Sequence, residues 1–303
     1  MDTRIKLRHI QGFVEIARSG SLKSAAGTLN LTQPAMSKTL RELEGIVGSS
    51  LMRRSRAGIS LTAEGEVFDH FAQMALAALR QGLDGIDQVG AEAAGRLTVG
   101  ALPSVAAALM PRAVAEFGAL APGAVRRIFD GPHAYLIERL RLGTLDLVVG
   151  RLGEPDTMQG ISFTQLYTEE VAFVVRAGHP LLGAPDLRAL PDWPILYPPP
   201  GAAIRPLVER LLIATGVGPL PNRIETVSGG FGRAYTRGSD AVWIISGGVV
   251  AREVADGTLM RLPFDTALTA GPVGLMTRPD LPASPLHRMF ERAVARAGSG
   301  GAT

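Results

Sequence analysis

The sequence contains no cysteine among its 303 residues. This absence excludes disulfide bonds, thiolate metal sites, cysteine nucleophiles and redox sensing by thiols. The chain also lacks any run of about 18 uninterrupted apolar residues, so it has no predicted membrane span. Its first eight residues are charged and contain no apolar signal-peptide segment, which predicts a protein of the reducing cytoplasm.

Catalytic motifs are missing as well. The five histidines form no HExxH sequence and no metal-ligand spacing, and the chain has no Gly-x-Ser-x-Gly turn. The glycine-rich runs fit neither a dinucleotide-binding fingerprint nor a phosphate-binding loop. We therefore expect no enzyme activity, no metal and no cofactor.

The charge is distributed unevenly along the chain. The formal net charge is only +3, but residues 1–60 hold ten Lys and Arg against four Asp and Glu, a difference of +6. A basic segment joined to a near-neutral body favours a polyanion-binding module, although a basic face is often only a solvated surface. A chain of this length has room for two or three domains.

Apolar spacing predicts three helices in the basic segment, with Ser21 capping the second helix and Thr32 capping the third. The apolar face of the third helix is formed by Met36, Leu40, Leu43 and Val47. The polar row on its other side consists of Gln33, Pro34, Ser37, Lys38 and Arg41. This arrangement predicts a helix-turn-helix in which Gln33 and Arg41 contact bases in the major groove, while Ser37 and Lys38 contact phosphates. The alternative is that the polar row only solvates the helix.

Residues 51–62 resemble a short hairpin with arginines near a glycine turn. These arginines are Arg53, Arg54 and Arg56. Beside a recognition helix, such a hairpin is a wing whose arginines enter the minor groove or contact phosphates.

A long helix is predicted to follow the hairpin, with Thr62 as its N-cap and Glu64 in its first turn. Its apolar positions recur at steps of three and four: Phe68, Ala72, Leu76, Leu79, Leu83 and Ile86. This spacing predicts a coiled-coil seam between two copies of the chain. The alternative is that the stripe packs on its own subunit.

From Arg96 onward, short apolar strands alternate with helices, which is typical of α/β domains. Ligands of such domains bind beyond the carboxyl ends of the strands. The candidate effector-binding residues at these positions are Ser104, His133, Arg151, Ala202, Ala203, Ser228 and Phe231. Together they would offer hydrogen-bond donors to a carboxylate. Each also has a structural alternative: the two serines as helix caps, His133 as a surface turn residue, and Arg151 paired with Glu154 or Asp156.

Several of these segments resemble one family. Residues 21–26, 31–37 and 61–65 are similar to the signature of LysR-type transcriptional regulators, with Met52 where the family usually has Phe. The resemblance implies an N-terminal all-α winged helix-turn-helix with a long linker helix, followed by an α/β two-lobed, periplasmic-binding-protein-like effector domain. The implied boundaries are 1–61 for the DNA-binding domain, 62–89 for the linker helix, 90–95 for a hinge, 96–167 with 275–303 for lobe I, and 168–274 for lobe II.

The implied partners are double-stranded DNA with a promoter inverted repeat, further copies of the chain in a homodimer and homotetramer, RNA polymerase, and a small-molecule effector, with no membrane. Residues 204–214, 221–229 and 234–246 resemble a family branch that controls the protocatechuate pathway, and a related regulator of a galactose-binding protein. The first resemblance predicts a carboxylated intermediate of aromatic catabolism as the effector. The second leaves a sugar as the alternative.

Overall fold

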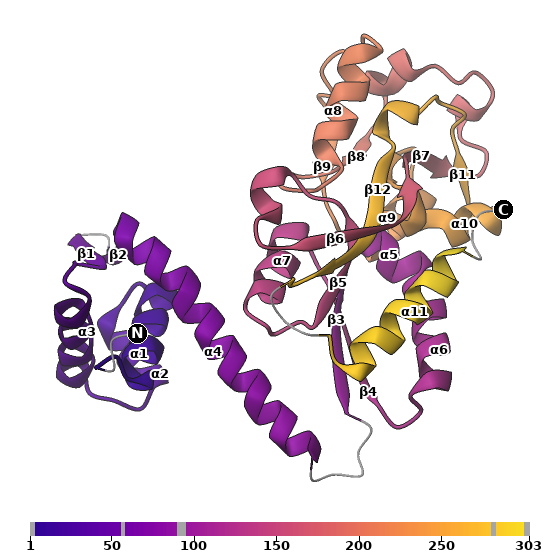
Figure 1. The fold of residues 1–303 in the computed structure, drawn as a ribbon. Helices are drawn as coiled ribbons and strands as arrows, with labels where there is room; N and C mark the ends of the chain where they lie inside the picture. Colours follow the sequence, from indigo (N-terminus) through magenta and orange to yellow (C-terminus); the bar gives the residue numbers. More distant parts are fainter. Residues whose placement is uncertain (1–3, 56–57, 90–94, 280–282, 300–303) are drawn as a thin grey trace. The chain divides into compact units, whose positions relative to one another are not determined.

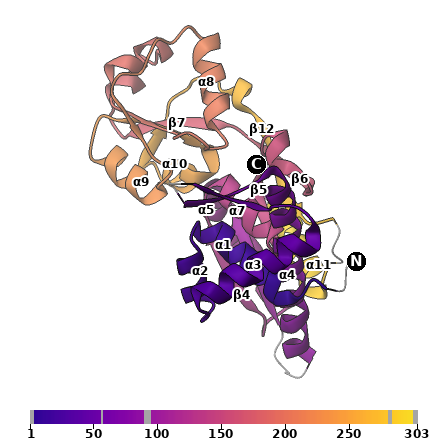
Figure 2. The same cartoon turned by 90° about the vertical axis from the view of Figure 1, so that its left-hand side faces the viewer.

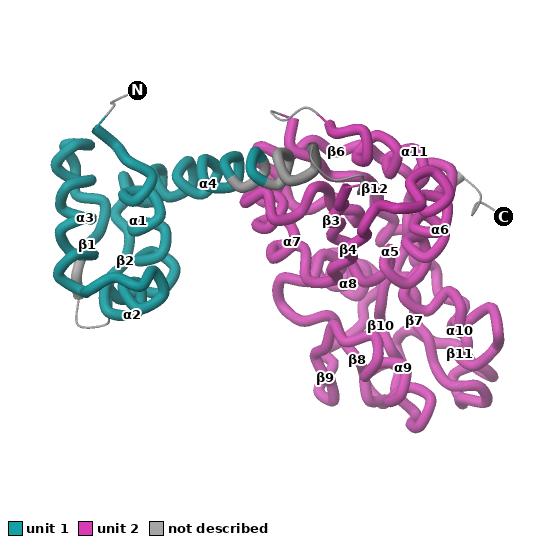
Figure 3. Tube along the Cα trace, turned by 90° about the horizontal axis from the view of Figure 1, so that it is seen from below, with its two compact units in different colours: residues 1–90 teal, residues 91–303 magenta. Residues whose placement is uncertain are grey.

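The computed structural model describes residues 4–55, 58–89, 95–279 and 283–299. It divides into two compact units, Met1–Gly90 and Ala91–Thr303 (Figure 3). Each unit contains its own cluster of buried apolar side chains. The two units are therefore separate folding modules.

The first unit begins with three helices, α1 (Leu7–Ser19), α2 (Leu22–Thr28) and α3 (Gln33–Val47) (Figure 2). The expected caps are present: the side chain of Ser21 accepts a hydrogen bond from Ser24 N, and that of Thr32 accepts one from Ala35 N. Gly20 ends α1 with a φ of 64°, a left-handed conformation that glycine adopts without steric cost.

The core of this unit differs in part from the predicted apolar faces. Met36, Leu40 and Leu43 are buried as expected, but Val47 is exposed near the end of α3. In α1 the fully buried residues include Phe13 and Ile16. The prediction of Val47 as a core residue was wrong: Val47 is the last residue of α3 and is 37% exposed.

The wing is a two-stranded antiparallel hairpin of β1 (Met52–Ser55) and β2 (Gly58–Leu61). It is joined to α3 through Glu44, whose Oε1 accepts hydrogen bonds from Leu51 N at 2.8 Å and Met52 N at 3.2 Å. The long helix α4 (Ala63–Val89) follows, with the Thr62 hydroxyl accepting from Gly65 N at 2.9 Å. A Cβ at Gly65 would lie 1.9 Å from Leu51 O, so only glycine permits this approach of α4 to the hairpin.

The apolar stripe of α4 has two different surroundings. Phe68 packs edge-on against Phe13 with ring centroids 5.1 Å apart, and Ala72 is buried in the same core. Leu79 and Leu83 are exposed, as are Val67 and Phe71 nearer the start of the helix. The first part of the predicted seam therefore belongs to the core of its own unit, because the helix begins against α1.

The second unit contains two five-stranded sheets (Figure 1). The first has the order β4-β3-β5-β12-β6. Its strands are β3 (Arg96–Ala101), β4 (Val125–Asp130), β5 (Leu147–Arg151), β6 (Ser162–Glu169) and β12 (Gly271–Thr277). Strands β4, β3 and β5 are parallel, whereas β12 runs antiparallel to both of its neighbours.

Four helices accompany this sheet: α5 (Pro103–Ala108), α6 (Met110–Leu120), α7 (His133–Arg141) and α11 (Pro285–Ser299). Leu147 and Val149 of β5 pack in one apolar cluster with α6 and α11, whereas Val148 packs with α7 in another. The alternation of side chains along a strand therefore buries both faces of the sheet. Helices α5 and α6 are separate, because Pro111 near the start of α6 has no N–H to continue the hydrogen-bond ladder.

The second sheet has the order β11-β7-β10-β8-β9. Its strands are β7 (Val171–Arg176), β8 (Ile195–Tyr197), β9 (Arg223–Glu225), β10 (Val242–Ser246) and β11 (Leu259–Arg261). The helices of this lobe are α8 (Arg205–Ala214), α9 (Gly229–Arg237) and α10 (Ala251–Ala255). Trp243 lies fully buried beneath Gly232 of α9, where a Cβ would lie 2.3 Å from the indole ring.

The chain passes from the first sheet to the second at Glu170, between β6 and β7. It returns through a 3-10 turn, η5 (Ala267–Thr269), into β12. The predicted lobe limits at residues 167 and 274 fall within β6 and β12. Both strands belong to the first sheet over their whole length. The lobes also contact each other where α5 packs against η4 (Gly247–Val250).

Candidate DNA-binding surface and effector cavity

The polar row of α3 lies opposite the buried face of the helix. Gln33, Pro34, Lys38 and Arg41 are exposed, and Ser37 is half-buried. The turn between α2 and α3 is closed by a hydrogen bond from Leu31 N to Ala26 O, with Asn30 at a φ of 54°. The predicted outward orientation of the polar row agrees with the structure, and its contact with DNA remains a proposal.

An acidic residue modulates the charge of this surface. Glu42 Oε2 lies 3.2 Å from Arg8 Nη2 and 3.3 Å from His9 Nε2, and its Oε1 lies 3.9 Å from Lys38 Nζ. The hydrogen bond with His9 is the main cause that lowers the pKa of Glu42, with smaller contributions from Arg8 and Lys38. Arg41 donates from Nε to Ser37 O at 3.3 Å. The guanidinium of Arg41 thus has no carboxylate partner within the described residues.

The wing holds one of its arginines in place across the two strands. Arg53 pairs with Ser60 in the β1–β2 register and donates from Nε to Ser60 Oγ at 3.0 Å. Arg54 lies on β1, and Arg56 lies outside the described residues. Together with the contacts of Glu44, this pairing gives the wing a defined register beside α3.

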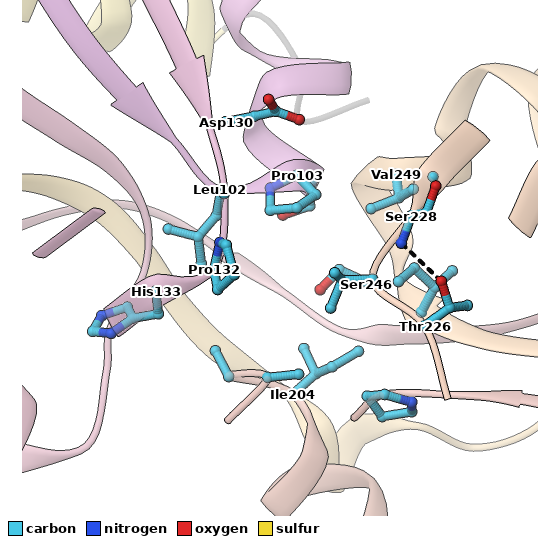
Figure 4. A pocket seen from close by; sticks show the side chains of 18 of the residues that line it. Leu102, Pro103, Asp130, Pro132, His133, Ile204, Thr226, Ser228, Ser246 and Val249 are labelled. Carbon is cyan, nitrogen blue, oxygen red and sulfur yellow. Dashed lines mark hydrogen bonds between the residues drawn. The ribbon is translucent and has the colours of Figure 1, made fainter. Parts of the chain in front are cut away.

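A cavity of about 910 Å³ lies between the two lobes of the second unit (Figure 4). Its walls include residues that end or directly follow six parallel strands, three in each lobe: Leu102 after β3, Asp130 ending β4, Arg151 ending β5, Pro198 after β8, Thr226 after β9 and Ser246 ending β10. This is the position at which open α/β sheets bind ligands, and the volume is that of a small-molecule site.

Six of the seven predicted effector-binding residues line this cavity: Ser104, His133, Arg151, Ala202, Ala203 and Ser228. Phe231 does not line it. Its ring is stacked on Tyr235 with centroids 5.4 Å apart and is 42% exposed. The structure thus places Phe231 outside the cavity wall, because its ring packs along α9 against Tyr235.

His133 borders the cavity with its imidazole turned away from the other side chains (Figure 4). A Cβ at Gly153 would lie 2.2 Å from His133 Cε1, so the ring lies against that glycine. Burial, and to a smaller extent the charge of Arg141, lowers the pKa of His133, which favours the neutral ring. His133 therefore shapes the wall and does not present a cation to a ligand.

Arg151 is 3% exposed, and its contacts are within the protein. Its Nη2 donates to Glu169 O at 2.8 Å and lies 3.6 Å from Glu169 Oε2, while Nη1 donates to Thr269 O at 3.3 Å. The partner is thus Glu169, neither Glu154 nor Asp156. This pair links the end of β5 to both crossings between the lobes.

Glu169 connects the lobes near the crossing from β6 to β7. Its Oε1 accepts a hydrogen bond from Gly248 N of η4 at 2.9 Å. Burial raises its pKa, while the charge of Arg151 and hydrogen bonds from Ser104, Gly248 and Ser246 oppose this increase. Ser104 and Ser246, which line the cavity, thus also contribute to the environment of this carboxylate.

Sequence reasoning missed several polar residues of the wall: Asp130, Thr226, Arg233 and Ser246. Arg233 lies one helical turn beyond Gly229, so it shares a face with the start of α9. That spacing was the available signal. In the described part of the chain, no helix is long and apolar enough to span a membrane, and no three potential metal-ligating side chains cluster together.

Comparison with known proteins agrees with this architecture. Residues 7–66 match the model of the bacterial regulatory helix-turn-helix protein, lysR family, and residues 90–299 match the LysR substrate binding domain. The chain is 50% identical to the HTH-type transcriptional regulator PcaQ of Agrobacterium fabrum over 98% of its own length and 97% of that protein. It is 34% identical to the uncharacterized HTH-type transcriptional regulator YdcI of Escherichia coli over 91% of each chain.

The fold is similar to that of a solved structure of the LysR family. The crystal structure of CbnR superposes with a TM-score of 0.65 at 20% identity, over 97% of this chain and 99% of CbnR. One family model matches the helix-turn-helix unit, and the other matches the α/β unit of the same chain. The chain therefore belongs to the LysR family: it is a DNA-binding transcriptional regulator and not an enzyme.

Proposed function

We propose that the chain binds a promoter inverted repeat as a homo-oligomer and changes its DNA contacts when a small molecule occupies the cavity between the lobes. One observation carries this proposal: an exposed polar row on a recognition helix occurs in the same chain as a cavity at the carboxyl ends of six parallel strands. The polar row and the wing arginines, Arg53, Arg54 and Arg56, supply the DNA contacts.

Dimerisation through α4 is the second part of the proposal. Val67 and Phe71 are 63% and 62% exposed, and Leu79 and Leu83 are exposed farther along the helix. An apolar stripe of this length is stabilised by burial against a second copy. Two recognition helices in one dimer address two half-sites, which raises the affinity for an inverted repeat. Further association of dimers gives the homotetramer.

The proposed effector is a carboxylated intermediate of aromatic catabolism. The 50% identity with PcaQ supports it, together with the resemblance of the second unit to regulators of the protocatechuate pathway. The alternative effector within the same mechanism is a sugar. A chain that recruits or repositions RNA polymerase at a bacterial promoter acts in the cytoplasm, and we propose both that partner and that location.

A DNase I footprint on the promoter beside the gene tests this function. We expect the purified chain to protect an inverted repeat, and an aromatic-pathway acid to change the protected length or the pattern of enhanced cleavage. A change caused by galactose and by none of the acids would assign the alternative effector. Failure to retard any promoter fragment at low ionic strength would contradict DNA binding by this surface.

A further inference from the structure

Arg233 is a cation in the cavity wall whose guanidinium is only partly used within the protein. It extends from α9, lines the cavity and is 31% exposed as a side chain. Its Nε contacts Glu253 Oε1 at 2.5 Å, and its Nη2 donates to Val249 O. Nη1 has no hydrogen-bond partner in the described part of the chain. Two contacts thus orient the group while one edge stays available.

The free edge lies beside the start of α9. A Cβ at position 229 would lie 2.8 Å from Arg233 Nη1. Any residue other than glycine at this position would therefore clash with the nitrogen. Gly229 and Gly230 also line the cavity. The available nitrogen therefore lies in the wall that a ligand contacts.

Two hydroxyl groups in the same wall can donate as well. Thr226 Oγ1 accepts a hydrogen bond from Ser228 N at 3.0 Å, and Ser228 Oγ accepts one from Phe231 N at 3.2 Å. Because each oxygen acts as an acceptor in these contacts, each hydroxyl hydrogen remains free to donate. Thr226 and Ser228 both line the cavity (Figure 4).

The other ionisable groups of the described wall do not offer such an edge. Both Nη atoms of Arg151 are bonded to carbonyl oxygens, and its side chain is almost fully buried. The ring of His133 is turned away and favours its neutral form. Asp130 brings a carboxylate, which repels an anion. Arg233 forms an ion pair with Glu253 through Nε, and the partly exposed edge at its Nη1 is the site on the α9 side that an anion can contact.

We propose that Arg233 determines the selectivity of the cavity for acids: its Nη1 binds the carboxylate of the effector, with Thr226 and Ser228 as flanking donors. This inference rests on the proposed function, because it names how the effector cavity recognises its ligand. It also assigns Arg151, the arginine expected from the sequence, to the connection between the lobes. Removing a charged hydrogen-bond donor from a binding site lowers the affinity for the ligand by about tenfold to hundredfold.

Calorimetric titration of the full chain tests the assignment. The probes are 3,4-dihydroxybenzoate and cis,cis-muconate as acids, methyl 3,4-dihydroxybenzoate as the uncharged match of the first, and D-galactose as a neutral sugar. We expect at least one acid to bind, and the ester and galactose to bind at least tenfold more weakly. An ester as strong as its acid, or no binding by either acid, would overturn the proposal.

Matched variants then separate Arg233 from its surroundings. Arg233→Gln should weaken acid binding by about tenfold or more, and Arg233→Lys should recover part of the loss because the charge returns without the planar fork. Arg237→Gln is the control, since Arg237 lies one turn farther along α9, is exposed and does not line the cavity. It should bind the acid as the natural chain does. Equal affinity of the Gln variant at 233 and the natural chain would also overturn the proposal.

Gly229→Ala covers the case in which a variant at 233 fails to fold. The added methyl displaces a flexible guanidinium without removing it, so the fold should persist while acid affinity falls. Unchanged affinity in this variant contradicts the assignment. Gel retardation of promoter DNA by each variant distinguishes the two levels of inference: loss of DNA binding concerns the proposed function, whereas loss of acid binding alone concerns Arg233.

Discussion

The polar row of α3 and the polar wall of the cavity use similar side chains under opposite conditions. Arg41 is exposed on a helix and contacts only a carbonyl oxygen one turn away. Arg151 is 3% exposed and bonded to carbonyl oxygens from two distant segments. An exposed arginine remains available to a partner, whereas a buried arginine must first be satisfied within the protein.

This difference shows that the residue type alone does not determine whether a polar side chain is available to a ligand. Ser37 and Ser104 were both predicted as ligand contacts, but Ser104 is buried near Glu169, whereas Ser37 is only half-buried. A buried polar group must be satisfied within the fold, so its neighbours decide what it offers to a ligand. The exposed row has no such requirement.

Replacing an arginine with methionine in the cavity wall and in the polar row of α3 should give the largest difference in stability. Arg151→Met removes one member of a buried ion pair and should lower the free energy of unfolding by about 3 to 5 kcal/mol. Arg41→Met should change it by less than about 0.5 kcal/mol. Urea unfolding followed by tryptophan fluorescence measures the Arg151 variant, because Trp193 and Trp243 both lie in the second unit. Far-UV circular dichroism of the same samples measures the Arg41 variant, because the first unit is mainly helical and has no tryptophan. Equal losses of stability would remove the contrast.

DNA binding should reverse that order. Arg41→Ala and Gln33→Ala should each weaken binding to the operator by about 1 to 3 kcal/mol, since a lost base contact has that magnitude. Binding to random DNA should change little. Fluorescence anisotropy on both duplexes measures the difference, with Arg18→Ala as the control because Arg18 is exposed on α1 and paired with Glu15. Parallel losses on both duplexes would count against base contacts by the polar row.

Acid pH should weaken the second unit through its buried histidines. Burial lowers the pKa of His133 and of His287, so the unfolded chain binds protons at a higher pH than the folded chain. Stability is therefore full above the unfolded pKa of about 6.5 and falls as the pH decreases below it, by at most about 1.4 kcal/mol per pH unit for each group. Urea unfolding between pH 7 and pH 5 should show this slope. Replacing both histidines with Gln should reduce the dependence of the unfolding free energy on pH. An unchanged slope would show that His133 and His287 do not cause this dependence.

The wing should give the smallest effect. Arg53→Ala should reduce the slope of log K against log salt by about 1 and weaken specific and random DNA alike, because a phosphate contact carries no sequence information. Ser60→Ala is the matched test of orientation, since Ser60 Oγ accepts from Arg53 Nε at 3.0 Å. We expect a smaller decrease in affinity with the slope preserved. Altered base preference in the Arg53 variant would assign it to the groove instead.

Much of the first unit could be predicted because its signals are local. Ser21 and Thr32 cap their helices as expected, and the spacing of Met36, Leu40 and Leu43 defines the buried face of α3. Strand β6 was not predicted, since it lies at a sheet edge where the apolar alternation is weak. Its pairing with β12 joins residues about a hundred positions apart, which no local pattern reports.

The sequence by itself determined the family, the orientation of α3, the wing and the location of the cavity at strand ends, because helix caps and apolar periodicity depend on neighbouring residues. Only the tertiary structure decided which polar groups are free. Arg151 is buried against Glu169 and Thr269 at the lobe crossings, while Arg233 stays partly exposed, with an Nη1 beside Gly229 that has no partner among the described residues. Hydrogen bonds between distant segments form only when the chain folds, and they determine which side chains remain for a ligand.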